Sequence, residues 1–215
     1  MTTLLIFDTT AAACSVAVWR NGIVVADRYE AMPRGQAERL LPMIQETLDA
    51  GGTHYDDLDG VCVTCGPGAF TGLRIGLAAA RGIALAGQVP LVGLSTFEAL
   101  AVRADGPCLV AIDTKRRDIY LQRFDDSAKP VGPARIATVD EVLREARDFS
   151  GPVVADNPAV FLTNATLPSV VQQALSGPPR ATAFAQHAAA KFEAGDTGAA
   201  PIYLRAPEAR LPGAR

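Results

Sequence analysis

At the start of the chain, apolar and polar positions follow the pattern of short buried strands. An apolar run over residues 4–8 predicts the first strand, and runs over 15–19 and 23–26 predict two more. The pair Asn21 and Gly22 between the last two runs is typical of a two-residue hairpin turn. We therefore expect three antiparallel strands to open the fold.

The pattern then changes to helices alternating with strands. Apolar residues between Ala37 and Leu48 recur every three or four positions, which places them on one face of a helix. Ser95 and Glu98 form a capping box that predicts the start of a helix ending near Arg103. The other patterns of this region predict strands over 60–64 and 89–93 and a helix over 70–86.

A weaker version of the opening pattern returns after residue 104. The run over 108–113 ends in Asp-Thr, as the run over 4–9 does, and a second strand is expected over 119–124. This repetition favours an α/β fold with two lobes built on one plan. We place the N-terminal lobe at 1–104 and a smaller, degenerate C-terminal lobe at 105–215. Further patterns predict helices over 139–147 and 181–194, a strand over 153–155 and an extended piece over 202–204.

Composition narrows the class of protein. The chain has 215 residues, of which 49% are hydrophobic and 20% charged, so it can bury a large core without disulfides. The formal net charge is −3, which excludes a strongly basic nucleic-acid binder. The first residues carry no basic segment, and no apolar stretch is long enough to span a membrane. We therefore expect a cytoplasmic protein without a membrane partner.

The cysteines and histidines are poorly placed for reactive chemistry. Cys62 and Cys65 are three positions apart on a predicted strand, so their side chains should point to opposite faces. All four cysteines lie in apolar runs and are interpreted as buried thiols. The chain has two histidines, His54 and His187, and neither has the spacing of a helix-borne metal pair. We therefore expect no metal site.

Polar residues follow the first predicted strand directly. Asp8, Thr9 and Thr10 open a turn in which a carboxylate could hold Mg²⁺ through water and hydroxyls could meet phosphates. Alanines follow, whereas turns that bind phosphate usually supply glycines that let backbone N–H groups close on the anion. An ordinary turn or cap is the alternative interpretation.

The most distinctive stretch joins a predicted strand to a predicted helix. Gly66 and Gly68 belong to a glycine-rich loop that could cradle an anion, or could simply be a tight turn. The helix after it carries two stripes of small residues, and such stripes usually allow another backbone to approach closely. We interpret this as a partner interface, with packing inside one protein's core as the alternative. The stripes are Gly72, Gly76, Ala80 and Ala84, and Ala78, Gly82 and Ala86.

Several segments resemble the TsaB (YeaZ) family, in order and over nearly the whole chain. They are IFDTTAAACSVAVW, PRGQAERLLPMI, CGPGAFTGLRIGLAAARGIALA, VPLVGLSTFEALA, AIDTKRRDIY and PIYLRAPEAR. The resemblance implies the duplicated fold of actin, Hsp70 and sugar kinases, which belongs to the ribonuclease H-like class. It also implies similarity to TsaD, the catalytic subunit that makes N6-threonylcarbamoyladenosine in tRNA.

The resemblance implies a role as a non-catalytic dimerisation subunit. Such a chain binds TsaD, joined by the ATPase TsaE, for modification of the adenosine next to the anticodon in tRNAs that read codons beginning with adenosine. Alone it is expected to form a homodimer through the same surface, and tRNA is met indirectly through the complex. No cofactor is implied, although weak binding of ATP or ADP stays open. Asp8, Thr9 and Thr10 are then a vestigial nucleotide loop.

The implied contact surface lies on the two helices of the N-terminal lobe, over about 35–50 and 70–86. If so, Gly76→Leu or Ala80→Leu should block docking of the partner while the chain still folds. The residues expected at the interface are Arg39, Leu40, Met43, Ile44, Gly72, Leu73, Gly76, Ala80 and Ala84.

Other classes of function depend on other residues. A weak ATPase or small kinase of the actin-like class would use the Asp8 turn together with Asp113. A metalloprotease is disfavoured because two unpaired histidines cannot hold the metal. Direct contact with tRNA would use Lys115, Arg116 and Arg117, for which a solvated turn is the alternative interpretation.

Overall fold

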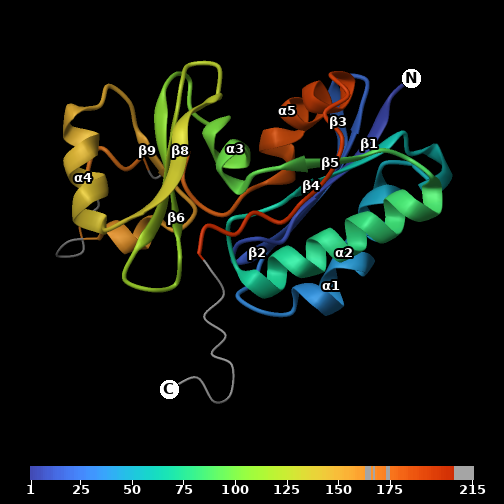
Figure 1. Ribbon diagram of the computed structural model, residues 1–215. Helices are drawn as coiled ribbons and strands as arrows, with labels where there is room; N and C mark the ends of the chain where they lie inside the picture. Colours follow the sequence, from blue (N-terminus) through green and yellow to red (C-terminus); the bar gives the residue numbers. More distant parts are fainter. Residues whose placement is uncertain (163–165, 167, 173–174, 206–215) are drawn as a thin grey trace, which may run out of the picture.

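Two β-sheets with helices packed on their faces form the frame of the chain (Figure 1). The computed structural model describes residues 1–162, 166, 168–172 and 175–205, and each structural statement below concerns these residues. Within them, no helix has both the length and the hydropathy needed to cross a membrane. The predicted α/β class, with two mixed sheets flanked by helices, is confirmed.

The first sheet has five strands in the order β3-β2-β1-β4-β5, with β1 at its centre. β1 is antiparallel to β2 and parallel to β4, so the opening hairpins and the later crossover strands share one sheet. Asn21 and Gly22 join β2 to β3, and both have the positive φ that the predicted hairpin turn requires. The strands are β1 (Thr3–Asp8), β2 (Ala13–Arg20), β3 (Ile23–Ala31), β4 (Gly60–Thr64) and β5 (Leu91–Leu94).

Helices cover both faces of this sheet, and the alternation of side chains along β1 decides which helix each residue meets. Leu5 packs in one core cluster with α1 (Gln36–Ala50) and α2 (Phe70–Gly87). Leu4 points to the opposite face and packs with α5 (Ala181–Glu193). Every residue of β1 is buried, as expected for a central strand covered on both sides.

The second sheet has four strands in the order β8-β7-β6-β9. α3 (Thr96–Ala101) packs on one of its faces and α4 (Val139–Asp148) on the other. The capping box predicted at Ser95 and Glu98 is present at the start of α3. The strands are β6 (Cys108–Asp113), β7 (Ile119–Phe124), β8 (Pro130–Ala137) and β9 (Val153–Ala155).

The two sheets repeat one arrangement of strands. In each, a central strand ending in aspartate, Asp8 in β1 and Asp113 in β6, is antiparallel to the next strand and parallel to a later one. The duplicated plan expected from the sequence is therefore present in the structure. It brings the two aspartate turns to corresponding ends of the two sheets.

Two features of the fold depart from the simple sequence pattern. β8 has no apolar alternation because Pro130, Gly132 and Pro133 interrupt it, and it lies at the edge of its sheet, where proline is tolerated. α5 follows the second sheet in sequence but packs on the first one. The segment after α5 also returns, since Gly198 bonds to β5 and the N–H of Ile202 donates to the carbonyl of Cys65 (2.7 Å). The range 105–215 therefore contributes to both sheets.

Candidate functional site

The turn after β1 is held together by its own hydroxyl groups. Asp8 Oδ1 accepts hydrogen bonds from Thr10 Oγ1 (2.6 Å), Thr10 N (3.2 Å) and Thr64 Oγ1 (2.5 Å). Asp8 is fully buried, and its Oδ2 atom has no hydrogen-bond partner among the residues described. Burial raises the pKa of Asp8, although the bonds from Thr10 and Thr64 oppose this shift. The carboxyl group is therefore closed to solvent.

The glycine-rich loop covers this turn. Ala69 N donates to the carbonyl of Thr10 (2.7 Å), and the N–H of Thr96 donates to the carbonyl of Gly66 (2.7 Å). At Gly68, a Cβ atom would collide with the backbone of Thr10, so a side chain there would push the loop off the turn. The loop thus acts as a tight packing turn, which was the alternative interpretation of its glycines.

The corresponding turn after β6 is more open. Asp113 accepts hydrogen bonds from Lys115 N (2.7 Å), Lys115 Nζ (2.8 Å) and Asn157 Nδ2 (2.8 Å). Burial opposes ionisation of Asp113, but these bonds outweigh it and hold its pKa below the usual value. Asp156, beside it, accepts from Asp113 N (2.7 Å), and burial raises the pKa of Asp156 to about 7.

A cleft of about 890 Å³ lies between the two aspartate turns. We call it the interlobe cleft. The first lobe supplies Thr10, Ala11 and Ala12, and the second lobe supplies Asp113 and Asp156. Thr9 and Asp8 do not line it, because both lie behind Thr10 in the closed turn. Of the predicted Asp-Thr-Thr set, the structure therefore presents only Thr10 to the cleft.

The stripe of α2 that contains Gly72 and Gly76 faces the protein's own core. A Cβ atom at Gly72 would collide with the carbonyl oxygen of Thr9, and one at Gly76 would lie 2.6 Å from Thr9 Oγ1. Thr9 Oγ1 also donates to the carbonyl of Gly72 (2.7 Å). Leu73, Ala80 and Ala84, on the same side of the helix, are buried in the first core cluster.

The same holds for the predicted interface residues of α1. Leu40, Met43 and Ile44 are buried in the core under the first sheet. Arg39 is partly exposed, but its guanidinium is paired with Glu30 (2.5 Å) and Glu46 (2.7 Å).

This placement bears on two expectations, the interface residues and the docking variants. Apart from Arg39, the predicted interface side chains pack inside the chain, so Gly76→Leu and Ala80→Leu would disturb folding and cannot test docking. The close approach that the small residues allow is made by the turn after β1, which belongs to the same protein.

The opposite sides of α1 and α2 are exposed, and we call them together the outer face. Leu41 is 53% exposed and Leu85 is 81% exposed, although both are large apolar residues. Ala78 is exposed, and apart from the adjoining backbone of α2 no described atom lies within 4 Å of the position that a Cβ atom on Gly82 would take. The second stripe of small residues, Ala78, Gly82 and Ala86, was the sequence signal for this face.

The remaining candidate groups are structural. The four cysteines are free and buried, with Cys62 and Cys65 in different core clusters on opposite faces of the sheet, as predicted. Burial raises the pKa of Cys62 to about 12, so it is a thiol at neutral pH. Across the described ranges, no three His, Cys, Asp or Glu side chains are grouped to hold a metal ion.

The basic cluster at 115–117 lies on the turn between β6 and β7. Lys115 pairs with Asp113 at 2.8 Å, and Arg116 borders the interlobe cleft. The structure thus ties Lys115 to the aspartate turn of its own lobe.

Comparisons with known proteins give a consistent set of relatives. A family model described as TsaD, tRNA N6-adenosine threonylcarbamoyltransferase, matches residues 30–206. The Escherichia coli protein named tRNA threonylcarbamoyladenosine biosynthesis protein TsaB is 40% identical over 126 residues, which cover 56% of this chain and 54% of that protein. The match therefore spans about half the length of this relative.

Two further relatives align over nearly the whole chain. An uncharacterized protein of Mycobacterium tuberculosis is 32% identical over 212 residues, covering 98% of this chain and 95% of that protein. The solved structure of YeaZ from Pseudomonas aeruginosa has a TM-score of 0.78 and 27% identity, covering 95% of this chain and 100% of that one. Both of the lobes described above are included in these matches.

Proposed function

The chain belongs to the TsaB (YeaZ) family, and from this premise we propose that it is a non-catalytic subunit that binds a TsaD-like transferase. The process it serves is the biosynthesis of N6-threonylcarbamoyladenosine in tRNA, after which the Escherichia coli relative is named. The matching family model carries the name of the transferase itself. If the two proteins share this fold, they can bind through equivalent helices, α1 and α2 of this chain and their counterparts in the transferase.

The observation that carries the partner role is the outer face of α1 and α2. Leu85 projects from α2 with 81% of its surface exposed, one turn from Gly82. Small residues at Ala78 and Gly82 let a second helix approach the backbone of α2, while Leu41 and Leu85 supply apolar area to bury. The proposal thus keeps the two helices named by the resemblance but assigns contact to their opposite sides.

The closed turn at Asp8 supports a role without chemistry. Asp8 is fully buried and its Oδ1 atom is bonded to Thr10 and Thr64, so a metal or phosphate group could reach the carboxylate only if the turn opened. We regard Asp8, Thr9 and Thr10 as a vestigial nucleotide loop that now stabilises the fold. Weak binding of ATP or ADP stays open, and no cofactor is part of the proposal.

Three further elements of the proposal follow from the family. A TsaE-like ATPase joins the pair, and tRNA is bound mainly through the transferase. In the absence of the partner, the outer face forms a homodimer. The homodimer and the complex with the transferase both use the outer face, so they compete for one surface.

Size-exclusion chromatography with light scattering tests the partner role. The chain is mixed with the TsaD protein of the same organism at micromolar concentration, and a stoichiometric complex is expected. Ala78→Arg, on the outer face, should abolish the complex because the long charged side chain holds the two helices apart. Ala190→Arg, at an exposed position of α5, is the matched control and should leave the complex intact.

Two results would contradict the proposal. Absence of any complex with the wild-type chain would remove the partner role. A complex formed equally well by Ala78→Arg would move the contact away from the outer face.

A further inference from the structure

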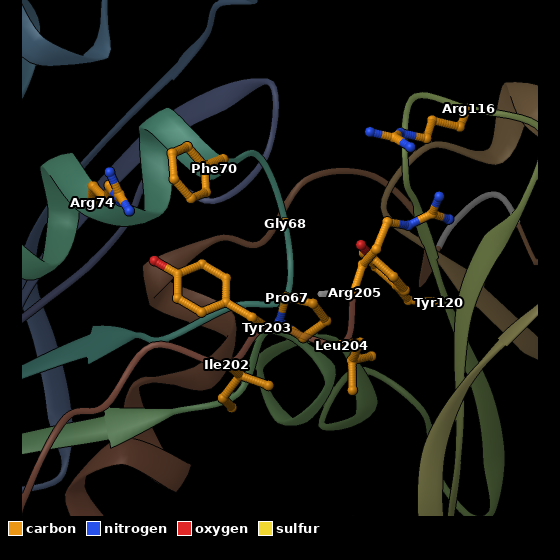
Figure 2. A pocket seen from close by; sticks show the side chains of 10 residues that line it. All are labelled: Pro67, Gly68, Phe70, Arg74, Arg116, Tyr120, Ile202, Tyr203, Leu204 and Arg205. Atoms are coloured by element: carbon orange, nitrogen blue, oxygen red, sulfur yellow. The ribbon is translucent and has the colours of Figure 1, made fainter. Parts of the chain in front are cut away.

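A second cavity lies beside the glycine-rich loop, and we call it the loop pocket (Figure 2). Its volume is about 410 Å³, within the range of small-ligand sites. Pro67 and Gly68 form its floor between the first turns of α2 and the segment 202–205. The hydrogen bond from Ile202 N to the carbonyl of Cys65 (2.7 Å) holds that segment beside the loop.

One wall of the loop pocket is aromatic. The ring centroids of Phe70 and Tyr203 are 5.8 Å apart with the planes inclined by 40°, and Figure 2 shows both rings on the same side of the pocket. Phe70 is 54% exposed and Tyr203 is 47% exposed, so neither ring is buried in the hydrophobic core. Tyr120 lies across from them. Arg74 already lies over the Phe70 ring, so the exposed Tyr203 ring is the part of this wall on which a flat ligand can stack.

The lining of the pocket is also rich in arginine. Arg74, Arg116 and Arg205 reach it from three separate segments, and the described lining residues include no acidic side chain. The Arg74 guanidinium lies 3.8 Å from the centroid of the Phe70 ring, next to the aromatic wall. Arg205 is paired with Asp118, which lies outside the lining and fixes the arginine in place. A ligand that fits this charge carries an anionic group.

We propose that the loop pocket binds a nucleotide, with its base stacked on Tyr203 and its phosphate at Arg74. Stacking on aromatic rings combined with cationic groups is how proteins hold unpaired nucleotides. A metal ion would meet repulsion from the arginines, and a lone phosphate would leave most of the volume and the aromatic wall unused.

The nucleotide can be free or part of a single-stranded RNA, because both present the same base and phosphate. The loop pocket adjoins the interlobe cleft, because residues such as Phe70 and Tyr120 line both, but Arg74 and Tyr203 line only the loop pocket. The inference is independent of the proposed partner, because binding is measured on the chain alone.

Isothermal titration calorimetry on the purified chain at low salt tests the proposal with three probes, which are AMP, inorganic phosphate and hexaadenylate RNA. AMP is expected to bind at least about tenfold more tightly than phosphate because stacking adds to the ionic contact. Hexaadenylate binding a further tenfold more tightly identifies an RNA strand as the ligand, and equal affinities identify a free nucleotide. No binding of AMP or RNA, or equal binding of AMP and phosphate, overturns the proposal.

Variants locate the binding. Tyr203→Ala and Arg74→Gln should each weaken AMP about tenfold, whereas the exposed controls Tyr55→Ala and Arg144→Gln should not. Ala12→Trp partly fills the interlobe cleft from an exposed position and should leave AMP binding unchanged. Full binding by both Tyr203→Ala and Arg74→Gln, with loss in Ala12→Trp, would place the nucleotide in the cleft and overturn the proposal.

Discussion

Helix α2 carries small residues on two faces whose surroundings are opposite. On the inner face, Gly72 and Gly76 lie against Thr9, and a Cβ atom at either position would meet an oxygen of that residue. On the outer face, Ala78 is exposed, and a Cβ atom added at Gly82 would meet no other segment described. The same residue types therefore have two causes. The inner stripe is required by the chain's own fold, and the outer stripe is available to a second chain.

The substitution Gly72→Ala tests the packing of the inner face and has the largest expected effect. The added methyl group would overlap the carbonyl oxygen of Thr9, which is backbone and cannot rotate away. We expect the free energy of unfolding to fall by about 3 kcal/mol or more, at the upper end of the cost of overpacking a core. Urea denaturation followed by circular dichroism measures it. A loss no larger than about 0.5 kcal/mol, typical of a surface change, would show that the inner face is not tightly packed.

The substitution Gly76→Ala tests whether Thr9 Oγ1 is the atom that requires a glycine at position 76. Its Cβ would lie 2.6 Å from Thr9 Oγ1, a side-chain atom held by its bond to the carbonyl of Gly72. We expect a loss of about 2 kcal/mol in the wild-type background. In the Thr9→Ala background the oxygen is absent, so the cost of Gly76→Ala should drop by about 1 kcal/mol or more.

A double-mutant cycle measured by urea denaturation gives this coupling directly. The single Thr9→Ala variant is its internal control, because it also loses the hydrogen bond to Gly72. Strict additivity of the two changes would mean that some other contact limits Gly76.

The accuracy of the predicted helices and strands depends on whether each element has a buried face. Periodicity predicted both helices and the central strands to within a few residues, because each has a buried face with regular spacing. The edge strand β8 escaped prediction, since it has no buried face of its own and its prolines resemble a loop.

The sequence named two helices as a contact surface, and the structure places most of the named side chains on their buried sides. Gly72, Gly76 and Ala80 are small because Thr9 and the first sheet press on them, and Thr9 is more than sixty residues away along the chain. Spacing within one helix carries no information about that neighbour. The second stripe of small residues was a signal for the outer face, and Leu85 strengthens it, because a large apolar residue on the same side as Ala78 and Gly82 marks a second apolar face.

The outer face is tested by Leu85→Glu. The side chain is 81% exposed in the free chain, so the folded state should keep its stability to within about 0.5 kcal/mol. In a complex, burying a carboxylate at the contact should weaken binding of the TsaD-like partner at least about tenfold, or about 1.4 kcal/mol. Val131→Glu, at an exposed position of β8, is the matched control. Calorimetric titration of the two proteins would contradict the assignment if both variants bound equally well.

The smallest expected effect is also the most direct test of the comparison, because it applies the change made at Gly72 to the other face. Gly82→Ala places a methyl group in open space on a helical residue, so its main consequence is the better helix propensity of alanine. We expect the free energy of unfolding to rise by about 1 kcal/mol, opposite in sign to the effect of Gly72→Ala. Urea denaturation of the isolated chain at several protein concentrations measures this gain and separates it from self-association. A gain that disappears on dilution would indicate that Gly82 is buried in a homodimer, and a loss at every concentration would mean that the two faces of α2 do not differ as described.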